Sequence, residues 1–385
     1  MSIGTLPLTD LAPLAVMLPV LGAAVTFMLV RRPRAQITVT VSALVLTLVL
    51  DALLLAAVWD TGIAAVHLGG WPAPLGITLV VDRLSALMLV VSALITLAVL
   101  LYASAQGLIN RDEGGPVSIF HPTFLILVAG VSNAFLAGDL FNLYVGFEIL
   151  LTSSYVLLTM GGTAQRIRAG VTYVVVSVLS SVVFLIAIAM IYAATGTVNM
   201  ADLAVKLGEL PTDVQMVLHV LLLVGFGIKA AVFPLSFWLP DSYPTAPAPV
   251  TAVFAGLLTK VGVYAMIRTE TLLFPGEHVN ALLLVVAALT MVVGVLGALA
   301  EEPSQVAEHV RGMLAVEPLE GRDRHGLAAD EDVERAGVED QPAIFGPQLV
   351  PEIPRRIAAD AVEVEPAEPA DPGTPPAPAT PAPAN

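Results

Sequence analysis

The stretch GFGIKAAVFP, residues 225–234, decides how the rest of the sequence is interpreted. It belongs to an apolar run at 215–239 that exceeds the ~20 residues needed to cross a bilayer, yet it contains a lysine, Lys229. Proline lacks a backbone N–H and clashes with the preceding helical turn, so this helix is predicted to break near Pro234. Four more prolines follow, at positions 240, 244, 247 and 249. We therefore expect a discontinuous membrane-spanning helix.

Apolar runs of similar length recur on both sides of this stretch. The whole chain is 57% hydrophobic and 13% charged, with a mean hydropathy of +0.85, whereas a soluble domain needs more charge to cover its surface. The composition and the runs predict an all-α polytopic membrane protein of about nine transmembrane helices, the seventh discontinuous. The predicted spans are 11–30, 37–59, 84–106, 118–137, 140–160, 170–194, 215–239, 249–268 and 279–300.

The charges divide the chain at residue 300. Residues 1–300 contain 11 Lys and Arg against 14 Asp and Glu, whereas residues 301–385 contain 6 against 18. The second stretch is acidic and rich in proline and alanine, and it has too little apolar surface to offset chain entropy. We predict a transmembrane bundle over 1–300 and a disordered tail over 301–385. The sequence has no basic patch that could replace phosphate counterions, which argues against a nucleic-acid partner.

The cysteine and histidine content restricts the possible cofactors. The chain contains no cysteine, which excludes disulfides, thiolate-bound iron–sulfur clusters and zinc–thiolate sites. Its six histidines show no ligand spacing on a shared helix. We therefore expect no bound metal or redox cofactor, and a protein that moves protons or ions rather than electrons.

Basic residues near the span ends predict the orientation in a bacterial inner membrane. No basic region precedes the first span, so it does not have the form of a cleaved signal. Arg31, Arg32 and Arg34 follow it, which predicts a cytoplasmic first loop, an outer N-terminus and a cytoplasmic tail. The same topology puts Arg111, Arg166 and Arg168 on the cytoplasmic side, and Arg83, Lys206 and Arg268 on the other.

A loop rich in turn residues separates the second and third spans. Between Val66 and Asp82 it contains three glycines and two prolines, flanked by short β-branched runs. This pattern predicts a small extramembrane hairpin. Trp71 lies in the loop, and we expect its ring at the headgroup boundary.

Three ionisable side chains lie well inside predicted spans, where they are costly and usually functional. Glu148 lies nine residues after Asp139, the expected helix start, which puts it roughly 13 Å along that helix. Lys260 lies ten residues beyond Val250, or roughly 15 Å along its own helix. Together with Lys229 they predict a proton or cation relay. The alternative is a permanent ion pair between Glu148 and one lysine that only joins two helices.

Several nearby residues are candidates for accessory roles. A break at Pro234 would free backbone carbonyls to hydrate an ion path, although neighbouring helices could equally satisfy an ordinary kink. Ser177, Ser180, Ser181 and Tyr173 share one helical face, which could hold water, although close packing of small residues is the stronger interpretation.

Two further residues lie near the ends of spans. His219 could shuttle protons or simply form a hydrogen bond near the start of its helix. Asp139 is either a carboxylate at an outer vestibule or a helix N-cap.

Three segments resemble a known family. GDLFNLYVGFE, residues 138–148, resembles the fifth-helix signature of the antiporter-like subunits shared by respiratory complex I and the Mrp-type cation/proton antiporters. The stretch from Lys229 to Lys260, with its Phe-Pro-Leu and Trp-Leu-Pro-Asp segments, is similar to the seventh and eighth helices of that family. The hairpin, with Gly70-Trp71 and Val81-Asp82, resembles that of the Mrp-type D subunits more than the complex I proteins. The resemblance covers about residues 15–300.

The resemblance implies a role for each matching residue. Glu148 would pair with Lys229 on the broken helix, and Lys260 would be the relay residue of the eighth helix. It also implies a hetero-oligomeric membrane complex with other Mrp-type subunits, exchanging Na⁺ or another monovalent cation for H⁺ without a redox cofactor. The alternatives are a proton-pumping subunit of an NADH-quinone oxidoreductase or membrane hydrogenase, and a non-transporting scaffold subunit. In each case we expect a transporter or membrane subunit rather than an enzyme by itself.

The sequence departs from the family pattern at two points. Ser236 occupies a position after the Pro-Leu pair where the family commonly has histidine. The family continues to about fourteen spans, whereas the resemblance ends here near Ala300. We therefore expect the first half of the family's inverted repeat, followed by a tail that is a frameshift product, a truncation or a regulatory appendage. Of these three we favour a frameshift.

Overall fold

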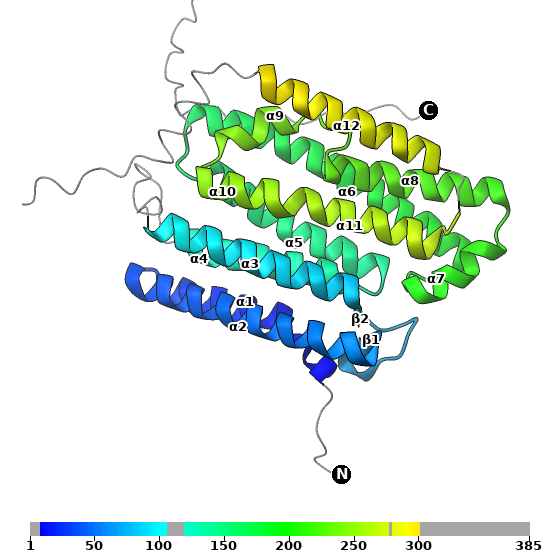
Figure 1. Ribbon diagram of the computed structural model, residues 1–385, viewed down its shortest axis with the longest axis horizontal. Coiled ribbons are helices and arrows are strands. Elements are labelled where there is room, and N and C mark those ends of the chain that lie inside the picture. The colour runs from blue at the N-terminus through cyan, green and yellow to red at the C-terminus, as the bar shows by residue number, and fades with distance from the viewer. Residues whose placement is uncertain (1–7, 106–118, 277–278, 301–385) are drawn as a thin grey trace, which may run out of the picture. The chain divides into compact units, whose positions relative to one another are not determined.

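The structure is a computed structural model that describes residues 8–105, 119–276 and 279–300. Within these residues, eight helical segments are long and apolar enough to cross a membrane. A ninth apolar helix, α4, has 17 residues and occupies the predicted fourth span. The helices run along a common direction (Figure 1), and the prediction of a polytopic all-α bundle is confirmed.

The first six spans follow the predicted ranges closely. A short 3₁₀ turn, η1 (Leu8–Leu11), precedes α1, and each later helix extends its predicted span by a few residues or shortens it. Their bounds are α1 (Leu14–Met28), α2 (Pro33–Thr61), α3 (Arg83–Ala105), α4 (Phe120–Leu136), α5 (Leu140–Thr159) and α6 (Ala164–Thr195).

Helix α4 lies inside the bundle and is buried along nearly its whole length. It packs against α1, α3 and α5, so protein rather than lipid surrounds it. Gly130 on α4 makes this close packing possible, because a Cβ there would lie 2.6 Å from the backbone nitrogen of Leu150 on α5. A helix that is buried on every side is largely apolar all round, and α4 follows this pattern with few polar residues, among them His121 and Asn133.

The predicted hairpin is present between α2 and α3. Strands β1 (Ala64–His67) and β2 (Thr78–Val81) pair antiparallel, with Ala64 opposite Val81 and His67 opposite Thr78. Gly76 is required in the loop, because a Cβ there would lie 2.2 Å from the carbonyl oxygen of Trp71. The Trp71 side chain is exposed, as its predicted place at the headgroup boundary would need.

Helix α6 leads through a short connection to the next span. Gly196 ends α6 in the left-handed region, where glycine carries no steric penalty. Helix α7 (Met200–Lys206) and the 3₁₀ turn η5 (Leu207–Glu209) follow, and Asn199 caps the start of α7 through its side-chain oxygen. The chain then enters α8 (Thr212–Ala230), which is the first part of the seventh span.

The seventh span is broken, as predicted, but the break comes earlier than Pro234. Helix α8 ends at Ala230, and Ala231 takes a left-handed conformation with a φ of 53°. The irregular segment 231–238 carries Pro234, and the helical turns α9 (Leu239–Ser242) and η6 (Tyr243–Thr245) follow it. The proline therefore prevents the helix from resuming rather than marking its last turn.

The eighth span consists of four consecutive helical pieces. These are α10 (Ala248–Val253), a π-helical turn η7 (Phe254–Leu258), α11 (Thr259–Arg268) and a second π-helical turn η8 (Thr269–Leu273). Such π-turns are often found at functional sites. Helix α11 approaches α8 closely, because a Cβ on Gly262 would lie 2.6 Å from the backbone nitrogen of Ala230.

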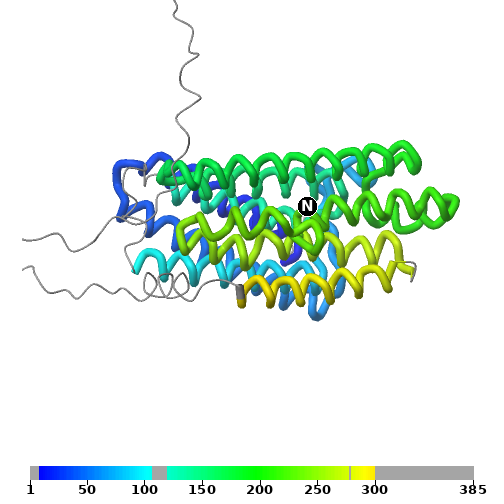
Figure 2. The backbone as a smooth tube through the Cα atoms, turned by 90° about the horizontal axis from the view of Figure 1, so that it is seen from above, coloured from blue at the N-terminus to red at the C-terminus, as the bar shows by residue number. Residues whose placement is uncertain are grey.

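The last described helix, α12 (Asn280–Ala300), lies along one edge of the bundle (Figures 1 and 2). Its apolar side chains are almost entirely exposed, and Thr290 is one of its few polar contacts, accepting a hydrogen bond from the Phe233 N–H at 3.0 Å. The predicted tail, 301–385, lies outside the described residues, so the division of the chain at residue 300 stays a prediction.

Candidate functional site

Glu148, Ser181 and Lys229 form a continuous hydrogen-bonded chain across three helices. The Lys229 Nζ atom on α8 donates to the Ser181 Oγ atom on α6 at 3.0 Å. The Ser181 hydroxyl in turn donates to the Glu148 Oε1 atom on α5. Within the described residues the carboxylate and the ammonium form no direct ion pair, so the serine hydroxyl is what joins them.

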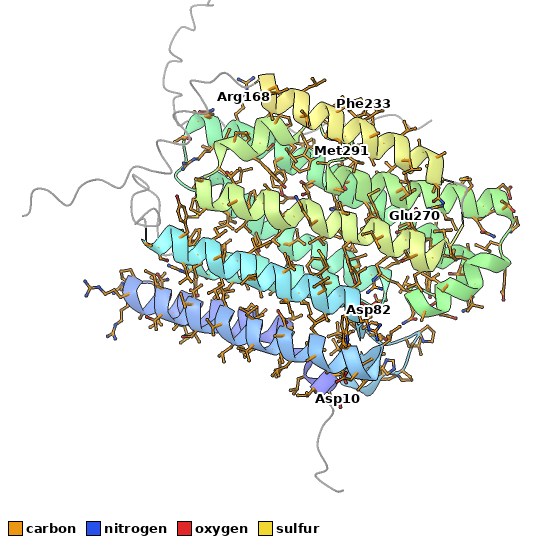
Figure 3. The ribbon with its side chains drawn as sticks, viewed as in Figure 1. Asp10, Asp82, Arg168, Phe233, Glu270 and Met291 are labelled. Carbon is orange, nitrogen blue, oxygen red and sulfur yellow. The ribbon has the colours of Figure 1, made fainter. Side chains whose placement is uncertain are left out.

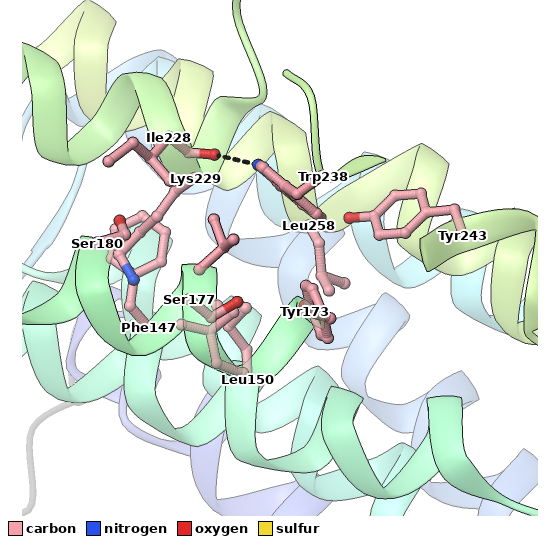
Figure 4. A pocket seen from close by; sticks show the side chains of 12 residues that line it. Phe147, Leu150, Tyr173, Ser177, Ser180, Ile228, Lys229, Trp238, Tyr243 and Leu258 are labelled. Carbon is pink, nitrogen blue, oxygen red and sulfur yellow. Dashed lines mark hydrogen bonds between the residues drawn. The ribbon is translucent and has the colours of Figure 1, made fainter. Parts of the chain in front are cut away.

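Lys229 is enclosed by protein, whereas Glu148 is partly exposed. The Lys229 side chain is 7% exposed, and its Nζ atom lies 4.9 Å from the centre of the Phe147 ring. Figure 4 shows the ammonium directed toward this ring. A ring face attracts a cation, most strongly where water is excluded. Lys229 therefore has two electrostatic supports, the Phe147 ring and the serine-linked carboxylate.

A small cavity of about 20 Å³ lies beside Lys229. Tyr173, Ser177 and Ser180 contribute its polar lining, and the other lining residues shown in Figure 4 are largely apolar. A cavity needs about 10–15 Å³ to hold one water molecule, so this space suits about one. Of the two accessory serines predicted here, Ser177 lines the cavity and interacts with the Tyr155 and Tyr173 hydroxyls, while the Ser180 hydroxyl donates to the Gly225 carbonyl oxygen at 2.9 Å.

The broken end of α8 is capped by protein donors. The Ile228 carbonyl oxygen accepts from the Trp238 Nε1–H at 3.1 Å (Figure 4), and the Gly227 carbonyl oxygen accepts from the Val232 N–H at 3.1 Å. These carbonyls are satisfied by the segment after the break, as an ordinary kink requires, rather than left to an ion path. The break still puts Lys229 in the last turn of α8, where the helix dipole favours a positive charge.

Lys260 does not join this chain of hydrogen bonds. It is exposed on α11, and its Nζ atom donates to the Ala255 carbonyl oxygen and, at 3.3 Å, to the Thr259 hydroxyl. Among the described residues it contacts neither Glu148 nor Lys229 through a hydrogen bond or ion pair. The Ala255 carbonyl belongs to the π-turn η7, which directs it toward the lysine.

The other two predicted accessory residues have defined partners. Asp139 is the N-cap of α5, and its Oδ1 atom accepts from the Asn142 N–H at 2.7 Å. His219 on α8 contacts Glu270 on η8, with 2.6 Å between the His Nε2 and Glu Oε1 atoms. Both lie away from the Lys229 cavity, whose lining includes neither residue.

The sequence did not identify three polar features of the bundle. These are the bridging role of Ser181, the ion pair between Asp82 and Arg268, and the partnership of His219 with Glu270. The signal for Ser181 was its place on the serine face of α6, although that face has several serines. Each pair joins residues far apart in the chain, so no local spacing reveals it. Within the described residues, no group of three or more His, Cys, Asp or Glu side chains could hold a metal ion.

Known antiporter proteins share much of this sequence. Residues 137–303 match the family model described as NADH:quinone oxidoreductase/Mrp antiporter, transmembrane. The D subunit of the Na⁺/H⁺ antiporter of Alkalihalophilus pseudofirmus is 41% identical over 298 residues, which cover 76% of this chain and 59% of the relative. The D subunit of a probable K⁺/H⁺ antiporter of Rhizobium meliloti is 42% identical over 276 residues, covering 69% of this chain and 50% of the relative. The chain thus spans half or somewhat more of the length of such relatives.

Two solved structures show the same arrangement of helices. A chain of the Mrp complex from Dietzia sp. DQ12-45-1b superposes with a TM-score of 0.71 at 34% identity, covering 77% of this chain and 55% of the other. A chain of the membrane-bound sulfane sulfur reductase, an archaeal respiratory complex, gives a TM-score of 0.71 at 30% identity, covering 77% and 61%. From the sequence match and the shared fold together, the chain belongs to the NADH:quinone oxidoreductase/Mrp antiporter family of membrane proteins.

Proposed function

We propose that this chain is a subunit of a multisubunit monovalent cation/proton antiporter and that protons pass through Glu148, Ser181 and Lys229. The observation that carries the proposal is the hydrogen-bonded chain from the Lys229 ammonium through the Ser181 hydroxyl to the Glu148 carboxylate. A hydroxyl both donates and accepts, so it can receive a proton from Lys229 while releasing its own to Glu148. The products are a neutral lysine and a protonated glutamate, and total charge is conserved.

Lys260 is the next proton-binding group in this proposal. No side-chain bond connects it to Lys229 within the described residues, so a proton passing between them would travel through water. The cavity beside Lys229 provides room for about one such molecule. The names of the relatives support Na⁺ or K⁺ as the exchanged cation and other antiporter subunits as the partners.

The distribution of charge supports an inner-membrane orientation with the N-terminus outside. Figure 3 shows Arg168 at one end of the bundle and Asp82 and Glu270 toward the other. At the second end, Arg268 is paired with Asp82 and Lys206 with Asp202, which neutralises two of its basic residues. The first end has the larger share of the arginines, so it is the cytoplasmic one by the positive-inside rule.

The test is cation exchange driven by a pH gradient in membrane vesicles that contain the chain with its partner subunits. Lys229→Ala and Glu148→Ala are each expected to abolish exchange, because each removes a proton-binding group. Lys206→Ala is the matched control, since this partly exposed lysine on α7 forms a hydrogen bond and ion pair with Asp202 and has none with a relay residue among the described residues. Unchanged exchange in both site variants would rule out the relay.

A second experiment separates the relay from a scaffold role. Replacing Glu148 and Lys229 together with Leu and Met removes both charges at once and leaves neither one buried alone. A relay then loses exchange while the complex still assembles, which co-purification of the partner subunits would show. A scaffold keeps both assembly and exchange.

A second candidate function is proton pumping within a respiratory membrane complex. The superposition on the sulfane sulfur reductase chain favours it, because that protein belongs to a respiratory complex. Purification of the native complex decides between the two: flavin or iron–sulfur partners would indicate the respiratory assembly. Co-purification with small antiporter subunits alone supports the first proposal.

A further inference from the structure

A second titratable pair lies on α8, away from Lys229. The His219 Nε2 and Glu270 Oε1 atoms are 2.6 Å apart, and the Phe274 ring stacks on the imidazole with a centre-to-centre distance of 4.4 Å and an interplanar angle of 9°. The stacking and the short contact fix both the plane and the rotation of the imidazole ring. His219 is therefore held in one orientation rather than free to turn.

Each member of this pair has a polar atom without a protein partner. Among the described residues, His219 Nδ1 forms no hydrogen bond, and the buried Glu270 Oε2 atom has none either. An unpartnered buried polar atom is costly unless water or a proton satisfies it. The site therefore has unused hydrogen-bonding capacity on both sides of the His219–Glu270 contact.

A cavity of about 200 Å³ opens beside His219. Its polar lining includes Thr212, Gln215 and His219, and Gly208 and Phe274 form part of its wall. Because one water molecule occupies about 30 Å³ of liquid, this space holds several. The cavity beside Lys229 is about one tenth as large, so the cavity at His219 has room for more water molecules.

The pair is separated from the Lys229 site by an apolar segment of α8. His219 and Lys229 are ten residues apart, or roughly 15 Å along the helix. Leu222 and Phe226 lie between them on the same helical stripe, and both are fully buried. Protons at His219 therefore exchange with the cavity, and a proton that passes between His219 and Lys229 needs a route other than this stripe.

The other titratable groups near this end of α8 are exposed acids, tyrosines and paired basic residues. Glu209 on η5 and Asp213 on α8 are exposed acids near the cavity. On the neighbouring elements, Tyr192 lies on α6, Tyr264 lies on α11, and two basic residues form ion pairs. These pairs are Lys206 with Asp202 on α7, and Arg268 on α11 with Asp82.

We propose that His219 and Glu270 form a proton-binding site that exchanges protons with water in this cavity, nearer the start of α8 and away from its broken end. The pair shares one proton across the 2.6 Å contact, and His219 lines the cavity in which that proton exchanges with water. The site rests on the proposed function in one respect: its role is to load or release the protons that the bundle translocates.

Water access is tested by diethylpyrocarbonate labelling of the full chain, with mass spectrometry resolving each histidine. We expect His219 to react at least tenfold faster than His121, which is 1% exposed and hydrogen-bonded to Thr40.

Gly208→Leu should slow the reaction of His219 at least fivefold, because its new side chain grows from a position with open space into the cavity. The matched control is Gly294→Leu on the exposed face of α12, where the rate should not change. Equal rates for His219 and His121, or no effect of Gly208→Leu, would overturn the proposal.

The role in translocation is tested by the pH profile of exchange in vesicles, from about pH 5 to about pH 8, which brackets the ordinary histidine titration. His219→Gln and Glu270→Gln are expected to shift or flatten the profile, whereas a purely structural role would lower the rate equally at every pH. A profile of unchanged shape in both variants refutes the loading role. Lys229→Ala separates the two proposals: if it leaves exchange intact, the relay fails, while the labelling result still decides the His219 site.

Discussion

The Lys229 Nζ atom and the Ser181 Oγ atom lie 3.0 Å apart, although 48 residues separate them in the chain. The same serine hydroxyl donates to Glu148, so one oxygen atom connects the buried ammonium with the carboxylate. This geometry makes Ser181 a participant in the candidate relay rather than a packing residue. The sequence alone assigned the serine face of α6 mainly to packing, and Ser181 departs from that assignment.

Removing the Ser181 hydroxyl should therefore disconnect the relay. A hydrogen bond to a charged group contributes about 1.5–3 kcal/mol, so Ser181→Ala is expected to lower cation exchange by roughly 10- to 100-fold. The measurement is the initial rate of exchange in vesicles under a fixed pH gradient. Ser153→Ala is the control, because that hydroxyl bonds only to the Ile149 carbonyl oxygen of its own helix. Exchange in Ser181→Ala equal to that in Ser153→Ala would show that the bridge carries no protons.

The sequence predicted those features of the fold that have local causes. The apolar runs gave the spans to within a few residues, the glycines and prolines around Trp71 gave the hairpin, and Pro234 gave the break. The sequence did not reveal that α8 ends at Ala230. That end depends on hydrogen bonds that the Val232 N–H and the Trp238 Nε1–H donate to the last carbonyl oxygens of the helix.

The site could be predicted only in part, for a related reason. Buried charge identified Glu148 and Lys229 as candidates, since a membrane span rarely tolerates a charge without a function. Their link through Ser181 depends on how three helices are rotated about their axes, which no spacing within one helix determines. The exposure of Lys260 could not be predicted for the same reason. Its depth along the span did not reveal that it is exposed on α11.

The close contact between α8 and α11 should make Gly262 sensitive to substitution. A Cβ there would lie 2.6 Å from the Ala230 backbone nitrogen, so Gly262→Ala must push α8 away next to Lys229. Overpacking of this kind costs about 1–3 kcal/mol, and we expect a lower midpoint of thermal unfolding in detergent together with slower exchange. Gly294→Ala on α12 meets open space and should leave both measurements unchanged or slightly raise the midpoint. Equal midpoints for the two variants would contradict the close approach.

Asp82 and Arg268 join the start of α3 to the end of α11 across 186 residues of sequence. Their Oδ2 and Nη1 atoms are 2.5 Å apart, and the Arg268 Nε–H also donates to the Tyr264 hydroxyl at 2.9 Å. Asp82→Asn leaves the guanidinium with no charged partner in a largely buried position, which should cost about 3 kcal/mol of unfolding free energy. Denaturant titration of the detergent-solubilised chain measures this loss. Asp60→Asn, at an exposed position on α2, should cause no measurable change.

The same pair predicts how stability depends on pH. Burial raises the pKa of Asp82, but the hydrogen bonds from Arg268 and the Ser85 N–H and the Arg268 charge outweigh burial, so its pKa is lowered from 3.8. A carboxyl group with a depressed pKa in the folded state stabilises the fold above its unfolded pKa. That stabilisation is lost as the pH falls through the folded value, below 3.8.

The thermal midpoint of the wild-type chain should therefore fall more steeply below about pH 4 than that of Asp82→Asn, which has no proton to bind at this position. Tryptophan fluorescence during heating at a series of pH values measures both curves. The difference between the two midpoints should be largest near neutral pH and should shrink as the medium becomes acidic. A difference that stays constant from neutral pH down to about pH 3 would mean that the Asp82 carboxylate contributes through packing rather than through its charge.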